Sequence, residues 1–116
     1  MNRIILCGGA GYIGTKLTEY LLDNTDHQIC IVDRLDFQLN ENFKKNRISN
    51  ERVTFHKKDI RDLDFMNELI TENDFVVNLA ALVGEPLCKI KPEEAVEVNY
   101  EAAKNLANLC KKKNIK

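Results

Sequence analysis

The chain has 116 residues, of which 44% are hydrophobic and 30% are charged, a balance typical of a globular protein and not of a disordered or fibrous one. Lys and Arg number 17 against 18 Asp and Glu, so a net charge of −1 gives no overall field to attract nucleic acid or an anionic membrane, and neither is predicted as a partner. Because no signal-peptide pattern or membrane-spanning run is found, the sequence predicts a cytoplasmic protein with a single domain, residues 1–116.

Apolar runs of strand length alternate with helical patterns in the first part of the chain. Residues 3–7 (RIILC) and 28–33 (QICIVD) are nearly continuous apolar runs, which are typical of strands buried on both faces. Between them, residues 12–23 predict an amphipathic helix. Its buried face is expected to hold the apolar residues that recur at helical spacing: Ile13, Leu17, Tyr20 and Leu21.

The alternation continues after an Asn-rich stretch at 35–50, which is predicted to be a loop. Residues 52–59 form a more polar run that favours a strand at a sheet edge, and residues 74–83 predict a strand that runs into a loop. A short helix is expected at 63–70 and the longest one at 92–113, which has proline in its first turn and lysines in its last.

This order of strands and helices is the pattern of a parallel sheet with right-handed crossovers. The predicted fold class is therefore α/β, with flanking helices on a Rossmann-type sheet. Since no strand follows the last helix, the chain is expected to be the front part of a larger doubly wound fold, ending before a substrate domain.

The stretch CGGAGYIG contains two overlapping glycine spacings. Gly9, Gly11 and Gly14 read G-x-G-x-x-G, and Gly8, Gly11 and Gly14 read G-x-x-G-x-x-G. Either one, placed between a strand and a helix, predicts a phosphate site, because bare backbone lets a pyrophosphate approach the amides at the helix start. A P-loop is excluded, since no G-K-[ST] follows the glycines.

An acidic residue ends the second predicted strand. Asp33 lies nineteen residues after Gly14, where a carboxylate accepts hydrogen bonds from an adenosine ribose diol and repels a 2′-phosphate. This favours NAD over NADP. The neighbouring Arg34 leaves the preference open, because a guanidinium can accommodate the 2′-phosphate.

The cysteines and histidines do not indicate a metal or redox site. None of the four cysteines forms a C-x-x-C pair, so buried, reduced thiols are expected, and neither histidine has a partner at metal-ligand spacing. The residues concerned are Cys7, Cys30, Cys88, Cys110, His27 and His56.

Four stretches in chain order support a more specific interpretation. They are GGAGYIG at 8–14, IVDR at 31–34, KKDIRD at 57–62, and VVNLAALVG at 76–84 with Asn99 in the later EVNYEAAKNL. Together they resemble the extended short-chain dehydrogenase/reductases, the nucleotide-sugar epimerases and dehydratases. The resemblance covers nearly the whole chain and favours the glycine spacing that begins at Gly8.

The resemblance implies roles for several residues. Asp59 and Ile60 would lie beside the adenine ring, and Asn99 would bridge its helix to the fourth strand, a role that we weigh above a catalytic one. Residues 79–81 would line the path of the cofactor, although simple close packing explains them equally well. The expected cofactor-binding residues are Gly8, Gly11, Tyr12, Ile13, Gly14, Asp33, Arg34, Asp59, Ile60, Leu79, Ala80, Ala81 and Asn99.

The chain also departs from the family pattern. Cys7 replaces the usual Thr, and Asn78 stands where His is common. The family's Ser/Thr and its Tyr-x-x-x-Lys pair come after the point where this sequence ends. Tyr12 and Tyr100 each precede a lysine at that spacing, but both lie in the wrong elements, so no catalytic residue is expected in the chain.

The resemblance implies the NAD-binding part of an enzyme that transiently oxidises a sugar carbon of a nucleotide-sugar. The sheet order would be 3-2-1-4, with the dinucleotide at the carboxyl ends of strands 1 and 4. The chain alone is expected to be inactive. Two alternatives stay open: a non-catalytic dinucleotide sensor, and an interaction module in which the 92–113 helix forms a homodimer.

Overall fold

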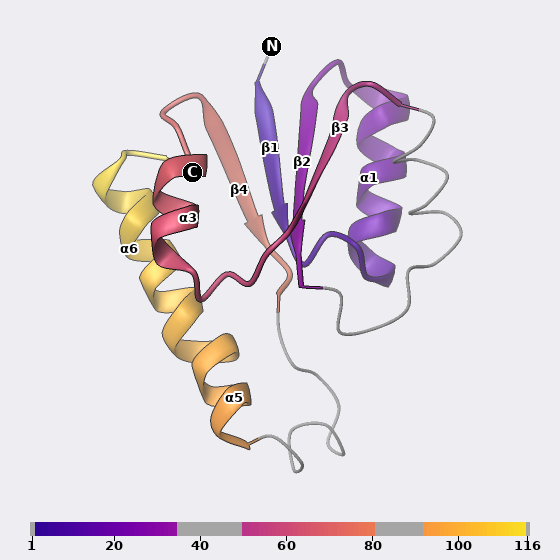
Figure 1. The fold of residues 1–116 in the computed structure, drawn as a ribbon. Helices are drawn as coiled ribbons and strands as arrows, with labels where there is room; N and C mark the ends of the chain where they lie inside the picture. The colour runs from indigo at the N-terminus through magenta and orange to yellow at the C-terminus, as the bar shows by residue number, and fades with distance from the viewer. Residues whose placement is uncertain (1, 35–49, 81–91, 116) are drawn as a thin grey trace.

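The computed structural model describes residues 2–34, 50–80 and 92–115. In these residues, parallel strands form one sheet in the order β3-β2-β1-β4, and helices lie on both of its faces (Figure 1). The α/β class and the predicted 3-2-1-4 order are both confirmed. The strands are β1 Arg3–Cys7, β2 Gln28–Asp33, β3 Val53–Lys57 and β4 Asp74–Asn78.

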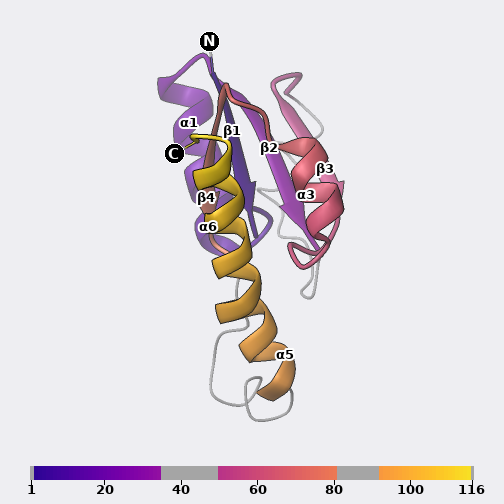
Figure 2. The same cartoon turned by 90° about the vertical axis from the view of Figure 1, so that its left-hand side faces the viewer.

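The helices are arranged in two layers around the sheet. Helix α1 covers one face, while α3 and the long helical segment that ends in α6 cover the other (Figures 1 and 2). The bounds are α1 Tyr12–Asn24, α3 Leu63–Leu69, α5 Pro92–Val96, the π-helical η1 Glu97–Ala102 and α6 Ala103–Lys112. The predicted helix over 92–113 is thus one segment with a π-helical part that its sequence pattern did not reveal.

Alternate residues of the central strands fill two separate cores. Ile5 of β1 lies between Cys30 of β2 and Val76 of β4, and this row faces α3 and α6. Leu6 and Ile31 point to the other side, toward α1. Because both faces of β1 and β2 are covered, these strands are apolar nearly throughout, and their predicted bounds match those in the structure.

The predicted buried face of α1 is partly wrong. Leu17 and Leu21 pack against the core, as predicted. Ile13 and Tyr20, however, are 67% and 62% exposed. The fully buried positions of the helix are Gly14, Thr15 and Thr18. The bare backbone at Gly14 lets the start of the helix approach the glycine loop closely. The buried threonine hydroxyls also have partners, since each donates to the carbonyl four residues earlier, at 2.7 and 2.8 Å.

The ends of the other predicted elements shift by a few residues. β3 is shorter than the predicted 52–59, and it lies at an edge of the described sheet, as expected from its polar pattern. The strand predicted over 74–83 ends at Asn78. The loop predicted at 35–50 lies almost entirely outside the described residues, as do Cys88 and Ala81.

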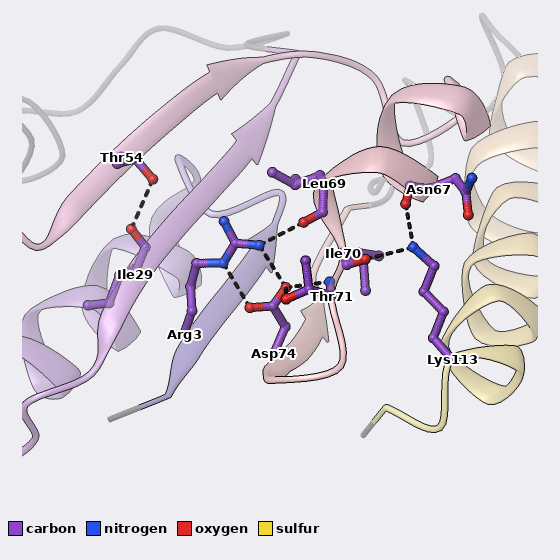
Figure 3. A network of polar contacts seen from close by, with 9 residues as sticks. All are labelled: Arg3, Ile29, Thr54, Asn67, Leu69, Ile70, Thr71, Asp74 and Lys113. Atoms are coloured by element: carbon purple, nitrogen blue, oxygen red, sulfur yellow. Dashed lines mark hydrogen bonds and ion pairs between the residues drawn. The ribbon is translucent and has the colours of Figure 1, made fainter.

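A polar network joins the elements at the amino ends of the strands (Figure 3). The Arg3 guanidinium donates to both carboxylate oxygens of Asp74, at 2.8 and 2.7 Å, and to the Leu69 carbonyl. Asp74 also accepts from the Thr71 amide at 2.8 Å. On the other side of α3, Lys113 donates to carbonyls at the end of that helix. Among the described helices, none is long and apolar enough to cross a membrane.

Candidate functional site

The glycine loop leaves β1 at the carboxyl end of the sheet, where β2 and β4 also end (Figure 1). The Gly8 amide donates to the Val32 carbonyl of β2 at 2.7 Å, and the Leu79 amide donates to the Cys7 carbonyl at 2.7 Å. The loop is therefore attached to both neighbours of β1. This is the point where the strand order changes direction, which is where open α/β sheets bind ligands.

Gly8 is required by backbone geometry and by packing. Its φ is +76°, and a Cβ there would lie 2.7 Å from the Ala80 amide nitrogen. Leu79 and Ala80 thus pack directly against the loop, which supports the close-packing interpretation of this pair. The Asn78 carboxamide accepts from the Ala80 amide at 3.0 Å, an interaction that the sequence did not reveal.

Gly14 is required by packing alone. A Cβ at this position would lie 2.5 to 2.6 Å from three backbone atoms of Gly9, so the first turn of α1 and the loop approach each other without room for a side chain. Gly9 is similarly constrained, because its Cβ would lie 2.9 Å from that of Leu6. These two glycines set the position of the helix start relative to the strand.

Gly11 differs from the other loop glycines, since neither its backbone nor its neighbours require a glycine. Its φ is −76°, which any residue adopts, and the nearest atom to an added Cβ is the Gly8 carbonyl oxygen at 3.7 Å, an ordinary contact distance. Gly11 is the N-cap of α1, where no side chain caps the helix and no acidic residue lies in the first turn. The helix therefore begins with bare backbone and the positive end of its dipole.

Asp33 lies beside this loop, as its place at the end of β2 predicts. Its carboxylate accepts a hydrogen bond from the Ala10 amide at 3.0 Å. The half-buried carboxylate is thus oriented by the loop itself. Sequence reasoning placed Asp33 correctly near the glycines but did not identify Ala10 as its partner.

Asp59 lies between two guanidinium groups. Arg34 donates to it at 2.9 Å, and Arg61 donates through its side chain at 2.9 and 2.7 Å and through its backbone amide at 2.9 Å. Burial opposes ionisation of this carboxyl, but the hydrogen bonds from Arg61 and Arg34 outweigh burial and lower the pKa of Asp59. Its neighbour Ile60 is 5% exposed and packs in the core beneath α3 and α6.

The remaining predicted residues are placed as follows. Tyr12 and Ile13 begin α1 and are largely exposed, at 75% and 67%. Asn99 lies in η1 and is exposed, so its bridge to β4 stays a prediction. Ala81 lies outside the described residues.

The described cysteines are free thiols in apolar surroundings. Burial, reinforced by the nearby Cys30 and Cys110, raises the pKa of Cys7 to about 12, and burial also raises the pKa of Cys30. A thiol with such a pKa is a poor nucleophile at neutral pH. Within the described residues, no group of three His, Cys, Asp or Glu side chains is arranged to hold a metal ion.

The parallel sheet, the glycine loop leading into α1 and the acid at the end of β2 define a Rossmann-type nucleotide-binding fold. Residues 4–116 match the NAD dependent epimerase/dehydratase family, and the chain belongs to that family.

Individual relatives agree with this assignment. The chain is 32% identical to UDP-N-acetyl-alpha-D-glucosaminuronate decarboxylase of Bacillus cytotoxicus, a match covering 90% of this chain and 32% of that protein. The UDP-N-acetylglucosamine 4-epimerase structure of Methanobrevibacter ruminantium superposes with a TM-score of 0.85 at 31% identity, covering 99% of this chain and 36% of the other.

A third relative was solved with a cofactor. The UDP-glucose-4-epimerase of Stenotrophomonas maltophila, whose structure contains NAD and formylated UDP-arabinopyranose, superposes with a TM-score of 0.83 at 26% identity, covering 100% of this chain and 35% of the other. The chain thus spans about a third of the length of these relatives.

Proposed function

We propose that this chain binds NAD and is the cofactor-binding part of an NAD-dependent nucleotide-sugar epimerase or dehydratase. The observation that carries the proposal is Gly11. The fold does not require a glycine there, yet Gly11 lies at the start of α1, where a Cβ would make only one ordinary contact, 3.7 Å from the Gly8 carbonyl oxygen. A pyrophosphate bound to the amides of the first turn would need that space.

The neighbouring groups fit the rest of such a ligand. The Asp33 carboxylate, held by the Ala10 amide, is a hydrogen-bond acceptor for the hydroxyls of an adenosine ribose. The exposed Tyr12 and Ile13 lie at the same helix start and can contact the ligand through their backbone amides. Gly8 and Gly14 act indirectly, because they allow the loop and the helix to take these positions.

The cofactor's chemistry in this family would be that of a hydride acceptor, which permits transient oxidation of a sugar carbon. The described residues orient the dinucleotide by its phosphates and ribose. A proton-transferring tyrosine and the residues that select the sugar would have to come from outside the chain. We therefore expect the chain alone to bind NAD without catalysing turnover, as a single domain that a substrate domain completes.

The proposal is tested by titrating NAD and NADP into the chain and into Gly11→Ala by calorimetry. Because the substitution creates no clash, we expect the stability of Gly11→Ala to stay within about 1 kcal/mol of wild type. Its dissociation constant for NAD should rise about tenfold or more, since the added methyl group occupies the ligand's space. Asn2→Ala, an exposed neutral change at the opposite end of β1, is the control.

Two results would overturn the proposal. If the wild-type chain binds neither dinucleotide at millimolar concentration, it lacks the proposed function. If Gly11→Ala binds NAD as tightly as wild type, the pyrophosphate does not lie against the Gly11 backbone.

A further inference from the structure

The charges beside the proposed ribose site are coupled to one another. Asp33 and Arg34 are consecutive at the end of β2, and the Arg34 guanidinium reaches across to Asp59, which follows β3. The side chains of Arg34 and Asp59 are 22% and 24% exposed, so the ion pair is partly shielded from water. Charge pairs with limited solvent access are screened less than fully exposed ones.

Asp59 is also bound by a second arginine. Arg61 donates to the same oxygen, Oδ2, that Arg34 contacts, and its amide donates to Oδ1. Asp59 is therefore held both by Arg61 of its own loop and by Arg34 at the end of β2. Across Asp33, Arg34, Asp59 and Arg61 the formal charges cancel, and the carboxylate of Asp59 stays ionised near neutral pH.

We propose that Asp59 is a positioning residue that sets the preference for NAD over NADP by holding and neutralising the Arg34 guanidinium. The inference rests on the proposed function, because it concerns the same dinucleotide site. An arginine next to the ribose-binding acid is a ready partner for a 2′-phosphate. In this chain the Asp59 carboxylate occupies a guanidinium nitrogen of Arg34 that a 2′-phosphate would otherwise bind.

The charge balance decides the direction of the effect. A 2′-phosphate brings a charge of about −1.5 to −2 to the site. When Asp59 is ionised, the 2′-phosphate lies beside the negative charge of Asp33 and beside an Arg34 whose charge Asp59 already balances. With Asp59 replaced by asparagine, the charge of Arg34 is no longer balanced, and the local net charge becomes positive.

The test compares NAD with NADP, which differ only by the 2′-phosphate, on the whole 116-residue chain. Asp59→Asn keeps the size and the polar character of the side chain and removes its charge. We expect the ratio of NADP affinity to NAD affinity to rise about fivefold to tenfold, and this gain to shrink at high salt. Asp64→Asn, an exposed change of the same type on α3, should leave the ratio unchanged.

Substitution of the arginine tests the same idea in the opposite direction and does not depend on the folding of Asp59→Asn. Arg34→Met should lower the NADP-to-NAD ratio severalfold, since the formal charge of Asp33, Asp59 and Arg61 together would then be −1 instead of zero for the group of four. In the double variant Asp59→Asn/Arg34→Met, the gain produced by Asp59→Asn alone should be lost. A merely structural ion pair would weaken both dinucleotides together and leave the ratio constant.

The outcomes separate this inference from the proposed function. A wild-type chain that binds neither dinucleotide overturns both. A chain that binds NAD, with an unchanged ratio in Asp59→Asn and in Arg34→Met, overturns the inference alone. A ratio that rises equally in Asp64→Asn also overturns it, because the effect would then come from overall charge and not from the ion pair.

Discussion

Replacing Asp74 by asparagine tests the polar network that joins β1, β4 and the end of α3 (Figure 3). The Asp74 side chain is 2% exposed, while that of Arg3 is 31% exposed. Removing one partner of a fully buried pair costs about 3–5 kcal/mol. Because water reaches part of Arg3, we expect a smaller loss, about 2–3 kcal/mol in the free energy of unfolding, with a decrease of roughly 10 °C in Tm.

The assay is urea unfolding of the wild type, Asp74→Asn, Arg3→Met and the double variant, followed by circular dichroism. The double-mutant cycle should give a coupling of at least about 1 kcal/mol between Arg3 and Asp74. Asp64→Asn, on the exposed surface of α3, should change stability by less than about 0.5 kcal/mol. A loss below about 0.5 kcal/mol in Asp74→Asn, or strictly additive effects, would refute the reasoning.

The same network predicts a dependence of stability on pH. Burial alone would raise the pKa of Asp74, but hydrogen bonds from Arg3 and Thr71 outweigh burial and lower it. The carboxylate therefore contributes its full stability above the usual aspartate pKa of about 3.9 and loses it as the pH falls through the lowered value. The difference between wild type and Asp74→Asn should be largest near pH 7 and should narrow below about pH 4.

Three further results are expected. Gly14→Ala should lose about 3 kcal/mol or more in urea unfolding, because the new Cβ would lie 2.5 Å from the Gly9 backbone, and stability equal to wild type would contradict that contact. Lys113→Met should lower stability by about 1 kcal/mol in thermal melts, since the carbonyls of Asn67 in α3 and of its C-cap Ile70 lose their donor. The exposed Lys112→Met should not lower stability, and equal effects of the two changes would contradict a specific role of Lys113. Cys7, with a pKa of about 12, should resist iodoacetamide at pH 8 until urea unfolds the chain, and peptide mass mapping that finds it alkylated in the folded chain would disprove its burial.

The strands that are buried on both faces were the easiest elements to predict. β1 and β2 are enclosed by helices on either side, so their sequences are apolar nearly throughout and stop at a glycine or an aspartate. The predicted bounds of the edge strand β3 and the predicted end of β4 were less accurate, because partly exposed strands tolerate the polar residues that also occur in loops.

Helix α1 shows why apolar spacing alone identified only part of the buried face. Leu17 and Leu21 pack against the core as the pattern predicts, whereas Ile13 and Tyr20 are exposed. The fully buried positions Gly14, Thr15 and Thr18 were not predicted. One reason is the close approach of the helix start to the glycine loop, where a Cβ at Gly14 would lie 2.5 Å from the Gly9 backbone. A periodicity of apolar residues carries no information about how closely two elements approach.

By itself, the sequence determined the class of fold through its apolar patterns, and it determined the family through short motifs between neighbouring residues. The strand order came from the resemblance to that family. Only the tertiary structure distinguished Gly14, which packing requires, from Gly11, which packing does not. It alone also paired Arg34 with Asp59, twenty-five residues away in the chain. Both distinctions depend on the distances between segments that the sheet brings together, and no local pattern encodes such distances.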